Sequence, residues 1–143
     1  MKKQIETKII INSSPEKVWD VLVNLEYYST WNPFIIQSFG EIIEGKTIEN
    51  HMKNGDKIIV FKPLITQVKK HEYFEWLGSL WTKGIFDGRH YFKLEKINDQ
   101  EVLLIHGEKF SGLLSGLILS LIKKSTLENF NLMNKALKKK CEG

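Results

Sequence analysis

The chain has 143 residues, of which 42% are hydrophobic and 27% charged, a composition typical of one folded domain and unlike that of a disordered chain. One cysteine, Cys141, excludes an intramolecular disulfide. No apolar run reaches the roughly 20 residues of a membrane span or has the form of a signal peptide, so we expect a cytoplasmic protein without a transmembrane segment. The net charge is +4, and the 21 basic residues are twenty lysines and a single arginine. Arginine is the side chain that binds phosphates and base edges through two hydrogen bonds, so we expect no nucleic-acid partner.

The N-terminal part predicts one strand followed by two short helices. Residues 5–11 alternate with a period of two, which predicts a strand. Either Ser14, with a proline at the first helical position, or Ser13, in a capping box, then starts a helix. The apolar residues of this helix recur at helical spacing: Val18, Val21, Leu22 and Leu25. A second short helix is expected over residues 28–31, because Asn32-Pro33 follows it directly.

The middle of the chain predicts an antiparallel meander of β-strands. Turn signals separate short β-rich runs, and we expect strands over residues 35–43, 47–52, 57–61, 68–77, 85–96 and 102–110. Asn54-Gly55 is the strongest hairpin signal among these turns. Because no long helix interrupts the runs, a parallel α/β sheet is disfavoured.

The last segment predicts one long helix. After Ser111-Gly112 the chain contains no proline, and an apolar stripe recurs at helical spacing through Leu114, Leu117, Ile118, Leu121, Ile122, Phe130, Met133 and Leu137. A helix of about 25 residues would be roughly 37 Å long, enough to cross a small domain. The predicted fold is therefore α+β, with residues 1–143 as a single domain. A curved antiparallel sheet of six to seven strands wraps around the long C-terminal helix, and the two short helices lie between strands 1 and 2.

Two patterns point to chemistry that their context does not support. Residues 40–47 match the phosphate-loop pattern, but two isoleucines and two glutamates fill the loop and a strand follows it, so a β-hairpin turn is the better interpretation. The histidines lack the spacing of metal ligands, and the chain has no cysteine pair. We therefore expect neither a metal site nor a cofactor.

Strand parity indicates a hollow that could hold a small molecule. Residues two apart share a face of a strand. If Phe92 and Phe110 point inward, then the polar residues on the same faces, His90, His106 and Glu108, point inward as well. The inward set comprises Phe74, Trp76, His90, Phe92, His106, Glu108 and Phe110. An apolar hollow with a few convergent polar groups is typical of a small-molecule site. A buried structural polar pair is the alternative that this pattern leaves open.

Short motifs occur along the whole chain, such as Ser-Pro-Glu-Lys-Val-Trp-Asp at residues 14–20 and Trp-Asn-Pro-Phe at residues 31–34, with others at 75–78, 86–92, 108–114 and 133–137. They resemble the START-like, helix-grip (SRPBCC) superfamily, in particular its polyketide cyclase/dehydrase type. The resemblance implies a deep cavity between the sheet and the C-terminal helix that holds a hydrophobic small molecule. The superfamily includes lipid carriers, hormone receptors, polyketide aromatases and cyclases, and chaperone activators, so the resemblance assigns no catalytic residue here.

We therefore expect a non-catalytic protein, a monomer or weak homodimer, that binds a hydrophobic or amphipathic small molecule such as a lipid or a polyketide. The expected ligand-binding residues are Trp31, Phe34, Phe74, Trp76, His90, Phe92, His106, Glu108, Phe110, Leu114 and Ile118. One alternative is an acid–base enzyme of the cyclase/dehydratase kind without a cofactor, in which a histidine is the general base and Glu108 orients it or acts as the acid. A second alternative is a chaperone-activator-like interaction module that uses either the lysine-rich terminal helix or the exposed part of residues 113–122.

Overall fold

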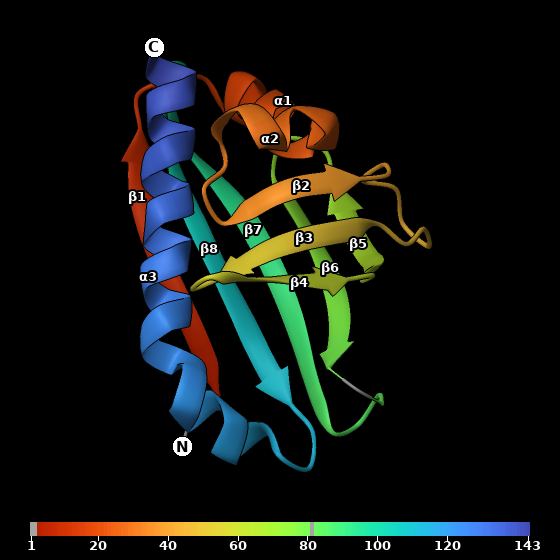
Figure 1. Ribbon diagram of the computed structural model, residues 1–143. Coiled ribbons are helices and arrows are strands. Elements are labelled where there is room, and N and C mark those ends of the chain that lie inside the picture. The colour runs from red at the N-terminus through yellow and green to blue at the C-terminus, as the bar shows by residue number, and fades with distance from the viewer. Residues whose placement is uncertain (1–2, 81) are drawn as a thin grey trace.

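The computed structural model describes residues 3–80 and 82–143, and Figure 1 shows a long helix lying across a set of strands. Three α-helices and eight strands follow one another in the order β1 (Gln4–Ile11), α1 (Pro15–Val23), α2 (Tyr28–Trp31), β2 (Ile35–Phe39), β3 (Glu49–Asn54), β4 (Lys57–Phe61), β5 (Leu64–Lys69), β6 (Tyr73–Leu80), β7 (Phe86–Asn98), β8 (Glu101–Ser111) and α3 (Ser115–Glu142). A single 3₁₀ turn, Leu25–Tyr27, joins α1 to α2. The predicted α+β fold is confirmed.

The strands form two antiparallel sheets instead of one continuous sheet. The larger sheet has the order β1-β8-β7-β6-β5, and the smaller one has the order β2-β3-β4. In the part of the chain that the structure describes, one isolated bridge between Thr47 and Leu64 joins the two sheets. Figure 1 shows the small sheet in front of the large one, with α1 and α2 at its upper edge. The two sheets and α3 therefore enclose a common interior.

The predicted number of strands was low because one run was read as a single strand. Residues 68–77 belong to two strands, β5 and β6, which pair with each other across a turn over residues 70–72. His71 in this turn has a φ of 67°, in the left-handed region. Histidine adopts this conformation more readily than β-branched residues do, but it is not one of the strong turn signals. The turn between β5 and β6 could therefore not be predicted, because residues 68–77 contain no glycine or proline.

The N-terminal elements form as their residues predict. The Ser14 side chain accepts a hydrogen bond from the backbone N–H of Lys17 at 3.2 Å, and Pro15 occupies the first helical position, so the Ser14 alternative is the correct cap. The second short helix, α2, covers residues 28–31 as expected. Asn54-Gly55 joins β3 to β4, and Gly55 has the positive φ, 63°, that such a turn requires. Residues 40–47 connect the paired strands β2 and β3, as the hairpin interpretation requires.

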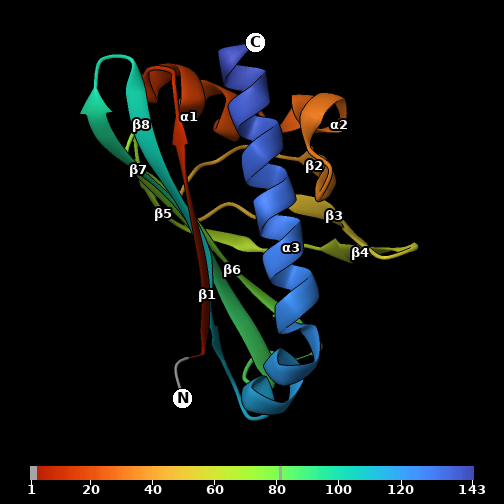
Figure 2. The same ribbon diagram turned by 90° about the vertical axis from the view of Figure 1, so that its left-hand side faces the viewer.

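The long helix α3 has 28 residues and a length of roughly 42 Å. Its second half enters the core, where Phe130, Met133 and Leu137 are fully buried. Its first half leaves Leu117 and Leu121 exposed to solvent. Figure 2 shows α3 running between the large sheet and the small one. Among the described residues, no helix combines the length and the apolar character needed to cross a bilayer.

Candidate functional site

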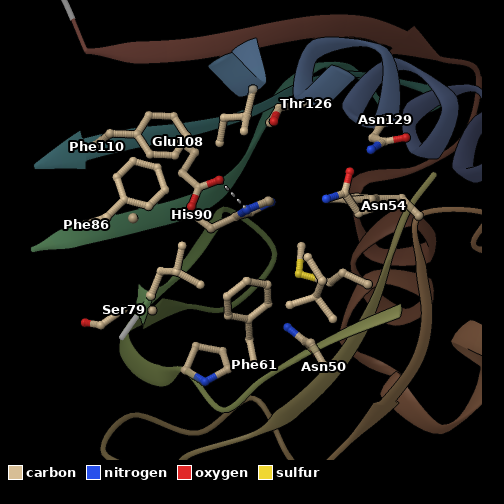
Figure 3. A pocket seen from close by; sticks show the side chains of 18 of the residues that line it. Asn50, Asn54, Phe61, Ser79, Phe86, His90, Glu108, Phe110, Thr126 and Asn129 are labelled. Carbon is tan, nitrogen blue, oxygen red and sulfur yellow. Dashed lines mark ion pairs between the residues drawn. The ribbon is translucent and has the colours of Figure 1, made fainter. Parts of the chain in front are cut away.

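A cavity of about 230 Å³ lies between α3 and the two sheets (Figure 3). This volume exceeds the roughly 150 Å³ of an apolar cavity that holds a benzene ring, so there is room for a molecule of one or two rings. Its apolar wall consists of Phe34, Met52, Ile59, Phe61, Pro63, Trp76, Leu80, Phe86, Phe110, Ile118 and Ile122. Exposed residues at the end of the β3–β4 hairpin and on α3 also line it, so the cavity reaches the surface between these two elements.

Six of the eleven residues predicted to bind a ligand line this cavity: Phe34, Trp76, His90, Glu108, Phe110 and Ile118. The other five lie elsewhere. Phe74 and Phe92 are fully buried with their ring centroids 4.9 Å apart, and Trp19 of α1 covers Phe74. Trp31 packs on Tyr28, and Leu114 is partly exposed just before α3. His106 lies behind His90, one side chain further from the cavity.

The prediction missed the part of the wall that comes from the small sheet and from the middle of α3. Alternate residues of β3 and β4 point inward: Asn50, Met52, Asn54, Ile59 and Phe61. Along α3 the inward residues are Ile118, Ile122, Ser125, Thr126 and Asn129, which follow helical spacing. The period-two and helical patterns were present in both segments. Polar residues occupy many of the inward positions, however, and so the patterns carried little hydrophobic signal.

His90 and Glu108 form the most polar part of the wall. They are direct partners in the β7–β8 register, and Nδ1 of His90 lies 3.4 Å from Oε1 of Glu108. His90 is 1% exposed, while the Glu108 side chain is 19% exposed. A Cβ at Gly88, also a wall residue, would overlap the Glu108 carboxylate. Glycine at position 88 therefore makes room for the carboxylate beside the histidine.

A chain of hydrogen bonds continues from His90 into the core. Nε2 of His90 lies 2.7 Å from Nε2 of His106, and Nδ1 of His106 lies 2.8 Å from Oδ1 of Asn134. Asn134 donates to Thr7 Oγ1 at 2.7 Å, and Thr7 donates to the backbone carbonyl of His106 at 2.8 Å. Burial lowers the pKa of His106 well below its usual value; the charge of His90 lowers it further, and the bond to Asn134 offsets part of the effect.

Asn50 provides a second polar point, on the other side of the cavity from Glu108 and His90 (Figure 3). Its side-chain oxygen accepts a hydrogen bond from Ser38 at 2.6 Å. Its amide nitrogen is buried and has no hydrogen-bond partner among the described residues. An unpaired buried donor costs about 1–3 kcal/mol, a cost that a ligand acceptor at this position would remove. The cavity thus has one polar point at His90 and Glu108 and another at Asn50, and its wall has further polar residues in Asn54, Ser79, Ser125, Thr126 and Asn129.

Adding a methyl group at Gly88 tests whether the carboxylate needs this space. We expect Gly88→Ala to displace Glu108 from His90 while the fold is kept, because the end of a glutamate side chain can move. Gly78→Ala is the matched control: Gly78 pairs with Gly88 across β6 and β7, and its new methyl group would make only ordinary contact with Pro63. A crystal structure of each variant measures the distance between His90 and Glu108. An unchanged distance in Gly88→Ala would contradict this reading of the wall.

Within residues 3–80 and 82–143, no three His, Cys, Asp or Glu side chains gather closely enough to hold an ion. His90 and His106 are hydrogen-bonded to each other, His106 is also bonded to Asn134, and Nδ1 of His90 lies 3.4 Å from Glu108; aromatic side chains stack on both rings.

A sheet that grips a long helix, with an apolar cavity between them, defines a helix-grip protein. The family described as polyketide cyclase/dehydrase and lipid transport matches residues 2–142, and the chain belongs to this family. No curated protein sequence matches closely enough to count as a relative.

Several solved structures share the fold. A START superfamily protein from Mycobacterium smegmatis is 16% identical with a TM-score of 0.75, and the match covers 97% of each chain. The Zhui aromatase/cyclase from Streptomyces sp. R1128 is 14% identical with a TM-score of 0.73, over 99% of this chain and 94% of that one. A hypothetical protein from Helicobacter pylori is 12% identical with a TM-score of 0.79, over 99% and 89%. At these identities the likeness concerns the fold alone.

Proposed function

We propose that the protein binds one small, largely apolar molecule of one or two rings in the cavity between α3 and the two sheets. The observation that carries the proposal is the cavity wall itself, in which eleven aromatic and aliphatic residues line the space together with polar groups that include His90 with Glu108 and, opposite them, Asn50. A ligand hydroxyl or carbonyl would lie against His90 and Glu108, and a ligand acceptor would lie against Asn50. Membership of a family whose description includes polyketide cyclases and lipid transport supports this proposal.

The size of the cavity sets the affinity to expect. Burying roughly 300 Å² of apolar ligand surface contributes about 7 kcal/mol before the costs of association are subtracted. Hydrogen bonds to the two polar points add a smaller amount, because each replaces a bond to water. We therefore expect dissociation constants between about 1 μM and 1 mM for single compounds that fit. NMR titration is suited to this range.

Two neighbouring residues of α3 allow a matched test. Ile122 lines the cavity, whereas Leu121 points to solvent with 77% of its surface exposed. We expect Ile122→Trp to fill the cavity and weaken the binding of a bicyclic probe such as 2-naphthol by about tenfold or more, a change of at least about 1.4 kcal/mol. Leu121→Trp adds a comparable side chain outside the cavity and should bind the probe as the wild type does.

The measurement is a titration of ¹⁵N-labelled protein with a panel of one- and two-ring compounds, 2-naphthol among them. Shifts confined to residues that line the cavity support the proposal. Absence of such shifts across the panel at millimolar concentration overturns it, as does equal weakening by both tryptophan variants. The acid–base alternative uses the same His90–Glu108 pair and differs in one outcome, since the bound compound would then be recovered chemically changed.

A further inference from the structure

The hydrogen bonds behind the cavity have a fixed direction because they end on a backbone carbonyl. The carbonyl oxygen of His106 carries no hydrogen, so the Thr7 hydroxyl must donate its one hydrogen to it. Thr7 Oγ1 then accepts from Asn134, and the group of Asn134 that faces it must be the amide nitrogen. The amide oxygen of Asn134 therefore faces His106.

This direction determines the protonation of both histidines. An amide oxygen accepts, so Nδ1 of His106 carries a hydrogen. His106 is fully buried among aromatic rings, where the neutral form is favoured, and its Nε2 is therefore bare. The contact of 2.7 Å between the two Nε2 atoms then requires the hydrogen to belong to His90. Thr7 and Asn134, which do not line the cavity, thus set the state of a residue that does.

The remaining nitrogen of His90 faces Glu108. A bare Nδ1 would place a lone pair against a carboxylate oxygen 3.4 Å away, so a proton belongs between the two groups. The other neighbours of the ring are Trp76 of β6, Phe92 of β7 itself and Phe130 of α3, which carry no charge. From the elements packed against it, His90 is therefore faced by two titratable groups, Glu108 and the neutral His106.

We propose that Thr7 and Asn134 are positioning residues that, through His106, hold a proton on Nε2 of His90 and so leave His90 and Glu108 sharing one further proton at the cavity wall. Such a pair has no net charge, and it can both donate and accept a hydrogen bond. It is therefore suited to an uncharged hydroxyl or carbonyl group of a ligand. This last step rests on the proposed function, whereas the position of the protons does not.

The test measures which ring nitrogens of His90 and His106 carry a hydrogen. Long-range ¹H–¹⁵N correlation spectra of protein labelled in its histidines distinguish the two neutral forms of an imidazole ring from its charged form. In the free wild-type protein at neutral pH, we expect His106 to carry its hydrogen on Nδ1 and His90 to carry hydrogens on both nitrogens. A spectrum in which His106 carries its hydrogen on Nε2 would overturn the proposal without any variant.

Two substitutions at Thr7 separate positioning from packing. Thr7→Val keeps the shape but removes the hydroxyl, so the Asn134 amide is free to turn and donate to His106. The hydrogen of His106 then moves to Nε2, and His90 keeps one hydrogen, on Nδ1. Thr7→Ser retains the hydroxyl and should keep the wild-type spectrum.

Identical histidine spectra for the valine and serine variants would show that Thr7 only packs, and would overturn the positioning role. Because the spectra are recorded without ligand, a failure here leaves the binding proposal standing. Conversely, a panel of compounds that does not bind leaves this result intact. The wild-type spectrum remains decisive if the valine variant does not fold.

Discussion

Phe130→Ala is expected to lower the free energy of unfolding by about 3–5 kcal/mol, the usual cost of removing a buried phenyl ring. Phe130 is fully buried, its ring stacks on His106 at a centroid distance of 4.3 Å, and it also contacts His90 and Phe34. Its loss would leave a void beside the histidines that no neighbour can fill. Since domains are stable by only about 5–15 kcal/mol, this one change removes a large fraction of the total.

Urea unfolding at neutral pH measures this effect. Phe39→Ala is the matched control, because it makes the same chemical change at a residue that is 51% exposed at the end of β2. We expect the control to lose less than about 1 kcal/mol. Equal losses in the two variants would contradict the view that α3 is anchored through Phe130.

Acidification is expected to remove the stabilising contribution of His106 before the carboxylates titrate. The pKa of His106 is well below its usual value of 6.5 in the folded state because the side chain is buried, so the folded protein keeps it neutral while the unfolded chain takes up a proton. The stabilising contribution is therefore complete above pH 6.5 and is lost as the pH falls below it. From pH 7.5 to 5.5, the contribution of His106 is expected to fall by about 1.4 kcal/mol, so the wild type should lose that much stability relative to a variant without this side chain.

Urea unfolding at the two pH values measures this loss, and two variants assign it. His106→Asn removes the group, so its change in stability between the two pH values should differ from that of the wild type by about 1.4 kcal/mol. His71→Asn removes a histidine from a surface turn, where asparagine tolerates the left-handed backbone, and should change as the wild type does. Carboxylates such as Glu142, whose pKa the bond with Lys138 lowers, titrate below this window. An equal change in the wild type and in His106→Asn would exclude a contribution from His106.

The sequence was sufficient for the fold and for one side of the cavity. Strand parity correctly brought His90, Glu108 and Phe110 to one inward surface, because β7 and β8 pair in register without a bulge between these positions. Strand parity shows which face of the sheet a side chain is on, however, and not whether that side chain lines the cavity or lies in the core. Phe92 shares a face with His90, yet Phe74 and His106 stack on it, so it belongs to the core. Whether an inward residue meets a cavity or another side chain depends on where α1 and α3 cross the sheet.

Asn50 shows the other limit of the sequence. It lies on β3, whose sequence Glu-Asn-His-Met-Lys-Asn has polar residues on both faces of the strand. The hydrophobic pattern therefore could not show which face of this strand points inward. Its inward position follows from the pairing of β3 with β2 and β4, which places Asn50 beside Ser38 and Phe61. The hydrogen-bond chain through Asn134 was equally hidden. It joins residues 127 positions apart, and only the packing of α3 on β1 brings them together.

The two halves of α3 differ in how strongly they are held, and this separates ligand exchange from folding. The second half fixes the helix in the core through Phe130, Met133 and Leu137. The first half has no side-chain cap at Leu114 and buries fewer residues, Ser115 and Leu119; it covers the cavity through Ile118 and Ile122, while Leu117 and Leu121 remain in solvent. Local opening of a helix end with few buried contacts costs much less than global unfolding. For the proposed ligand, substitutions at exposed positions in the first half of α3, such as Leu117 and Leu121, are therefore expected to change the rates of binding and release more than the melting temperature of the protein.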